Sequence, residues 1–126
     1  MTSARSRALG AVRVGDVIYG ISGAGNEKLL LVYDISENGI FARHITTQTS
    51  AKFDRASGET VAIPTGGSCR IASTAVLSED QYQVALGLDR KMRDGKGKGA
   101  FKLSEAEIQL LTGYRAFFAA HPLPDN

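Results

Sequence analysis

The first half of the chain alternates hydrophobic and polar positions over short segments, and residues typical of turns separate these segments. A period of two is typical of β-strands, because successive side chains point to opposite faces of a sheet. The pattern predicts six strands, at residues 12–21, 28–35, 40–47, 51–55, 60–63 and 69–74. Residues 28–35 are apolar on both faces, which indicates a central strand covered on both sides. The Asn38-Gly39 pair tolerates positive φ and predicts a tight hairpin.

The hydrophobic period changes to about 3.6 after residue 77, which predicts helices. Ser78 and Gln81 have the spacing of a capping box at the start of a helix over about residues 78–93. Ser104 and Glu107 repeat this signature for a second helix over about residues 104–120. Pro122 is expected to end that helix.

These elements predict an α+β fold in which the two C-terminal helices follow a small curved antiparallel sheet or a partly closed barrel over about residues 12–74. The opening V-G-D-V-I-Y at residues 14–19, followed by hairpins, is similar to that of small SH3-like barrels. Such a similarity implies no function, because this fold serves many. Residues 1–126 are expected to form one domain, with a flexible N-terminal arm at 1–11 and a flexible basic linker at 94–102.

Composition narrows the class of protein further. The chain has 126 residues, of which 43% are hydrophobic and 22% charged, so it can bury a core and is not globally disordered. The single cysteine, Cys69, excludes an internal disulfide. No apolar run exceeds the five residues at 29–33, far short of the roughly 20 residues that span a bilayer. We expect a cytoplasmic protein with no membrane association and no signal peptide.

The basic residues of the chain are concentrated in one segment. The net charge is only +2, but residues 90–102 contain a single acidic residue, Asp94, among many basic ones. Glycine alternates with lysine there, and this pattern lets backbone and ammonium groups approach a phosphate, although the spacing is not that of a Walker loop. The residues predicted to contact nucleic acid or another phosphate-bearing ligand are Arg90, Lys91, Arg93, Lys96, Lys98 and Lys102. A solvated linker without a ligand is the alternative.

Aromatic residues on the predicted strands can add a stacking surface for bases. The candidates are Tyr19, Tyr33, Phe41 and Phe53 on strands, with Phe101 beside the basic segment. A small barrel can expose two or three of them, although core packing is the commoner role of such rings. Their positions do not match an RNA-recognition signature.

Two other functions compete with nucleic-acid binding. The last helix has an apolar face wider than one contact stripe, which suits an adaptor, an inhibitor or a homo-oligomer subunit. The residues expected at that partner interface are Leu111, Tyr114, Phe117 and Phe118. Alternatively, the loops at 22–26 and 64–68 rim a pocket for a small molecule or nucleotide at one end of the sheet.

Residues suited to catalysis or metal binding lack a recognisable arrangement. His44, His121 and Cys69 are the only soft metal ligands, and their spacing is not that of a zinc site. The hydroxyl residues after His44 have no nucleophile elbow. We therefore assign no catalytic residue, metal ligand or cofactor, and an enzyme is the least favoured class. The leading hypothesis is a non-enzymatic binding protein that uses the basic segment.

Overall fold

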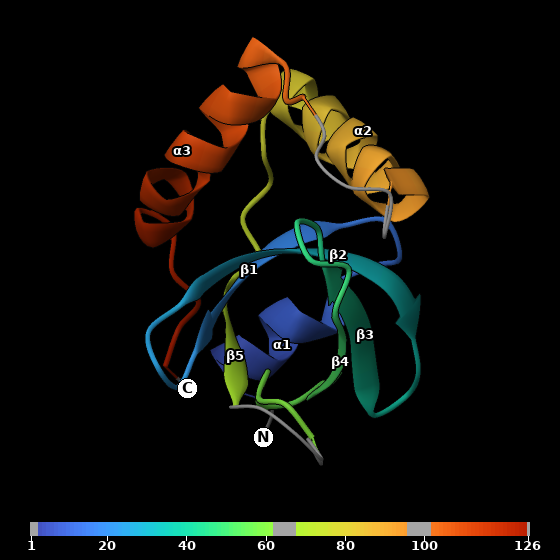
Figure 1. The fold of residues 1–126 in the computed structure, drawn as a ribbon. Helices are drawn as coiled ribbons and strands as arrows, with labels where there is room; N and C mark the ends of the chain where they lie inside the picture. Colours follow the sequence, from blue (N-terminus) through green and yellow to red (C-terminus); the bar gives the residue numbers. More distant parts are fainter. Residues whose placement is uncertain (1–2, 62–67, 96–101, 126) are drawn as a thin grey trace.

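The computed structural model describes residues 3–61, 68–95 and 102–125 and confirms the α+β class (Figure 1). In chain order the elements are α1 (Ala4–Gly10), β1 (Val17–Ser22), β2 (Glu27–Ile35), β3 (Gly39–His44), β4 (Ser50–Asp54), β5 (Cys69–Ser73), α2 (Glu79–Gly95) and α3 (Glu105–Ala119). Within these ranges, every helix is too short or too polar to cross a membrane.

The strands form one antiparallel sheet in the order β4-β3-β2-β1-β5, curled into a half-barrel (Figure 1). The predicted hairpin at Asn38-Gly39 is confirmed, since Ile35 faces Ile40 and the Ser36 N–H donates to the Gly39 carbonyl at 2.9 Å. Register shifts in β1 and β2 mark bulges, which increase the bend of a strand.

Residues 59 and 60, which follow β4, link the two edges of the half-barrel. The sequence predicts a strand at residues 60–63. Only its first residues are described, and they form isolated bridges. Thr60 pairs with Phe53 of β4, and Glu59 pairs with Arg70 of β5. Among the described residues, these two bridges close the barrel in part.

Each face of the sheet covers its own core, as the two-sided apolar pattern of residues 28–35 predicts. Leu30 and Val32 point into the half-barrel, and Leu29 and Leu31 point to the opposite face, where α2 and α3 pack. All four side chains are buried. Figure 1 shows α1 inside the curl of the sheet and the two C-terminal helices on its other side.

Helix α1 corrects the prediction of a flexible arm at residues 1–11. The Ser3 hydroxyl caps it by accepting from the Ser6 N–H at 3.0 Å, and Leu9 is fully buried in the half-barrel. A seven-residue helix holds too few apolar positions to show a period in the sequence. The buried guanidinium of Arg5 fastens this helix to distant backbone carbonyls, those of Ser57 (2.7 Å), Ile71 (2.6 Å) and Pro124 (3.3 Å).

The capping signals place both long helices correctly. At α3, the Glu107 N–H donates to Ser104 Oγ at 3.1 Å and the Ser104 N–H donates to Glu107 Oε1 at 2.7 Å, so this capping box is complete. At α2, the Gln81 N–H donates to Ser78 Oγ at 3.3 Å. The sequence thus locates the start of each helix.

Candidate functional site

A lysine of the predicted basic segment ties the end of α2 to the start of α3. Lys91 Nζ donates to Glu107 Oε1 at 2.6 Å and to the Lys102 carbonyl at 3.1 Å. Lys102 therefore lies beside the last turns of α2, close to the start of α3. The ammonium group of Lys91 therefore serves the fold, and its contact with a phosphate stays a prediction.

The partner of Lys91 is a buried carboxylate. The Glu107 side chain is only 9% exposed. Burial alone would raise the pKa of Glu107, but the hydrogen bonds from Lys91 and Ser104 outweigh it and hold the pKa below its usual value. The carboxylate is thus charged at neutral pH and neutralises Lys91 inside the protein.

Three other predicted basic residues remain on the surface. Arg90, Arg93 and Lys102 are exposed, and none forms an ion pair with a residue in the described ranges. Arg90 and Arg93 are three residues apart on α2, so their side chains are neighbours. Lys96 and Lys98 lie outside the described residues. The exposed cations therefore gather at the C-terminal end of α2, close to the start of α3.

A second ion pair connects α2 to the sheet. Arg43 of β3 makes a two-pronged contact with Asp89 of α2, from Nε to Oδ1 at 2.9 Å and from Nη2 to Oδ2 at 2.8 Å. Gln48 Nε2 also donates to Asp89 Oδ1, at 3.0 Å. Burial tends to raise the pKa of Asp89, but these hydrogen bonds and the charge of Arg43 lower it overall. Asp89 therefore fixes the position of the Arg43 guanidinium.

Arg43 also packs against an aromatic pair on the outer face of the sheet. Its guanidinium carbon lies 5.6 Å from the centre of the Tyr33 ring. The Tyr33 and Phe41 ring centres are 6.4 Å apart, with the rings tilted by 52°. Lys52 Nζ lies 5.5 Å from the centre of the Phe41 ring. Tyr33 is 39% exposed and Phe41 is half-buried, so both rings reach the surface.

An ion pair links the aromatic pair of the sheet to the helix that carries the exposed cations. Arg93 follows Asp89 by one helical turn, and its charge contributes to the lowered pKa of Asp89. Asp89 in turn holds Arg43 against the Tyr33 ring. We call this region the basic–aromatic surface; it consists of Tyr33, Phe41, Arg43, Lys52, Arg90 and Arg93. Flat rings beside positive charges can stack with bases and neutralise phosphates.

The other rings considered for stacking have different positions. Tyr19 and Phe53 are buried, at 3% and 0% exposure, and Phe101 lies outside the described residues. The sequence analysis did not include Arg43 and Lys52 in the surface. The sequence does indicate that Arg43 lies beside Phe41, because the two residues are two positions apart on one strand and must share a face.

The protein itself uses part of the apolar face of α3, which corrects the predicted partner interface for Tyr114 and Phe118. Tyr114 and Phe118 are buried, and both pack against Tyr19 of the sheet, with ring centres 6.0 Å and 5.4 Å away. Leu111 and Phe117 are half-buried against the same core. A helix that covers a broad sheet needs a face wider than one stripe.

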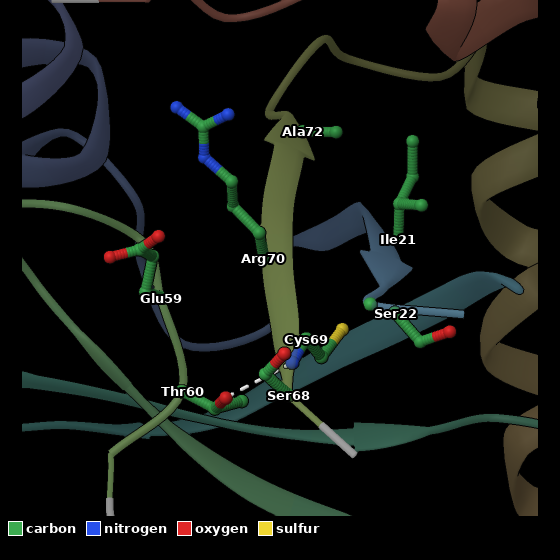
Figure 2. Close-up of a pocket in the computed structure, with 9 residues that line it drawn as sticks. Ile21, Ser22, Glu59, Thr60, Ser68, Cys69, Arg70 and Ala72 are labelled. Carbon is green, nitrogen blue, oxygen red and sulfur yellow. Dashed lines mark hydrogen bonds between the residues drawn. The ribbon is translucent and has the colours of Figure 1, made fainter. Parts of the chain in front are cut away.

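A cavity of about 560 Å³ lies at the end of the sheet where the small-molecule alternative places a pocket (Figure 2). Its lining residues are Ile21, Ser22, Gly23, Glu59, Thr60, Ser68, Cys69, Arg70 and Ala72. Ser22 and Gly23 come from the first of the two expected loops. Of the second loop, 64–68, only Ser68 is described.

Among the described residues, no three His, Cys, Asp or Glu side chains are grouped so that they could hold a metal ion. Both ring nitrogens of His44 lie within hydrogen-bond distance of threonine hydroxyls, those of Thr46 and Thr47. Burial raises the pKa of the Cys69 thiol, which disfavours the reactive thiolate.

Comparisons with models of known protein families, with curated proteins and with solved structures found no match to this chain. Function must therefore follow from the geometry of the chain's own residues.

Proposed function

We propose that this protein binds single-stranded nucleic acid at the basic–aromatic surface, without catalysing a reaction. The observation that carries the proposal is the Tyr33–Phe41 ring pair with Arg43 packed against it, because Asp89 joins Arg43 to the helix that carries the exposed Arg90 and Arg93. Rings on a sheet surface accept unpaired bases by stacking, and each stacked base contributes about 1–3 kcal/mol. Arginines one helical turn apart can contact successive phosphates.

Single strands suit this surface better than a duplex. The bases of a duplex are stacked on one another, so the flat faces that Tyr33 and Phe41 would contact are already occupied. Phosphate contacts alone would bind either form. The rings therefore favour single strands, whereas Arg90, Arg93 and Lys52 supply affinity that does not depend on sequence.

Fluorescence anisotropy with a labelled, mixed-sequence oligonucleotide of about 20 nucleotides tests this proposal. Four exposed cations, Lys52, Arg90, Arg93 and Lys102, lie on or beside the surface, so the logarithm of affinity should fall with the logarithm of salt concentration with a slope of about −3. Substituting both Arg90→Gln and Arg93→Gln should make the slope shallower by about 1.4.

Arg115→Gln is the matched control for that experiment. Arg115 lies near the other end of α3, where Nε pairs with Glu27 Oε2 at 2.8 Å. Removing this charge should leave both the affinity and the salt slope close to those of the wild type. R115Q removes one charge and the double variant removes two, so an effect of R115Q at least half as large would mean that net charge alone governs binding, which would contradict the proposed site.

A further inference from the structure

The cavity at the end of the sheet is built on a row of three side chains from adjacent segments. Arg70 of β5 faces Ile21 of β1 in the antiparallel register, and it faces Glu59 in the bridge on its other side. Directly opposed residues of neighbouring strands place their side chains on the same face of a sheet. The three side chains therefore line one continuous surface of the cavity.

The lining separates into a charged side and an apolar side. Figure 2 shows the Glu59 carboxylate and the Arg70 guanidinium on one side of β5, and Ile21 and Ala72 on the other. Ile21 and Ala72 are only partly buried against the core. A ligand that crosses β5 would thus meet an apolar wall at one end and charges at the other.

Arg70 carries a positive charge into the cavity without an ion-pair partner among the described residues. It is exposed, and no described carboxylate lies within ion-pair distance of it, including Glu59 directly across from it. A second guanidinium is close, since the pKa of Arg5 is lowered by burial and by the positive charge of Arg70. An anion beside Arg70 would offset this repulsion between like charges.

Two hydroxyl groups of the lining are free to donate. Ser22 Oγ accepts from the Asn26 N–H at 3.0 Å, and Thr60 Oγ1 accepts from the Cys69 N–H at 3.0 Å (Figure 2). Neither hydroxyl donates to a residue in the described part of the chain. Because a hydroxyl both donates and accepts, its hydrogen remains available for an acceptor in the cavity.

We propose that this cavity binds a small organic monoanion that consists of a carboxylate or phosphodiester group and an apolar body. The anionic group pairs with Arg70, and the apolar body packs on Ile21 and Ala72. Arg5 and Arg70 together with Glu59 carry a net charge of +1, so a single negative charge is favoured over a polyanion. The volume of about 560 Å³ lies within the range of ligand pockets.

Calorimetric titration with three aromatic probes tests the proposal. Benzoate and methyl phenyl phosphate are monoanions with the two head groups, and benzyl alcohol is a neutral match. We expect both anions to bind more tightly than benzyl alcohol, and the tighter anion identifies the head group. Arg70→Gln should weaken anion binding roughly 10- to 150-fold, because it removes a charge-assisted hydrogen bond. Arg13→Gln, an exposed arginine outside the cavity lining, should leave anion binding unchanged.

Two further readouts keep the test decisive if Arg70→Gln alters folding. Ala72→Leu fills the apolar side and should weaken binding of both anions without a change of charge. Cys69, the only cysteine of the chain, lines the cavity, so bound benzoate should slow its alkylation by N-ethylmaleimide. Equal binding of benzyl alcohol and benzoate, equal effects of R70Q and R13Q, or no binding of any probe at millimolar concentration would each overturn the proposal.

Discussion

Gly58 lies directly beneath the guanidinium of Arg5, so closely that a Cβ on Gly58 would be 2.9 Å from Arg5 Nη2. Gly58 also has a φ of +78°, which disfavours any residue with a side chain. The turn after β4 therefore leaves room for the Arg5 side chain, which helps to fasten α1 to the sheet. This contact between residues 53 positions apart could not be read from the local sequence.

Gly58→Ala should destabilise the protein by about 2–4 kcal/mol, since it adds backbone strain and also displaces Arg5. Gly25→Ala is the matched control, because Gly25 has a φ of +88° and open space around its Cβ position. That variant should cost only the strain, about 1 kcal/mol. Urea unfolding measures both values. Equal losses of stability in the two variants would show that Arg5 moves aside without destabilising the protein.

Lys91→Met should lower the free energy of unfolding by about 1–3 kcal/mol at pH 7, because it leaves the buried Glu107 carboxylate without its cation. Arg90→Met, on the next residue, should change it by less than about 0.5 kcal/mol. The depressed pKa of Glu107 means that its stabilisation is present above about pH 4.3 and is lost as the pH falls. The difference between K91M and wild type should therefore shrink in acid. A difference that persists unchanged at pH 3 would argue against the ion pair.

Alkaline pH should destabilise the protein through Tyr19. Burial first, and the neighbouring Glu27 second, raise the pKa of Tyr19 to about 12. The unfolded value is about 10, so stability is fully present below pH 10 and falls as the pH rises towards 12. Tyr19→Phe should flatten this part of the stability curve. Tyr33→Phe, at an exposed ring, should leave the fall of stability with pH as steep as in the wild type. A flatter curve for Y33F and an unchanged curve for Y19F would contradict the assignment to Tyr19.

Tyr33→Ala should weaken binding of the single-stranded oligonucleotide by roughly 5- to 150-fold, which corresponds to the loss of one stacked base. Tyr33→Phe keeps the ring and should bind nearly as well as the wild type. Titrations at a fixed salt concentration compare the three proteins. If Y33F loses as much affinity as Y33A, then the phenol hydroxyl and not stacking is the source of the contact.

Local signals in the sequence located most of the fold. The Ser104–Glu107 capping box, the Asn38-Gly39 turn and the two-sided apolar pattern of β2 each act over a few residues, so they are visible without tertiary contacts. Helix α1 was missed because its stability comes from distant partners. Arg5 reaches carbonyls of residues 57, 71 and 124, and nothing near Arg5 in the sequence indicates this.

The candidate surface could be predicted only in part, for the same reason. A run of basic residues shows where positive charge lies, but it does not show which charges the fold neutralises. Lys91 and Arg93 look equivalent in the sequence, yet among the described residues Lys91 forms an ion pair with a buried carboxylate and Arg93 does not. Similarly, Tyr33 and Tyr19 both lie on strands, and the packing of α3 decides that Tyr19 is buried while Tyr33 is open.

The most direct test of the proposed nucleic-acid surface is an amide ¹H–¹⁵N NMR titration of the full chain with an unlabelled single-stranded oligonucleotide. The account predicts that the largest shifts fall on β2 and β3 around Tyr33 and Phe41 and on α2 around Arg90 and Arg93. Shifts at β5 should remain small. Saturating binding with its largest shifts elsewhere, or no shifts at low salt, would contradict the claim that this surface binds nucleic acid.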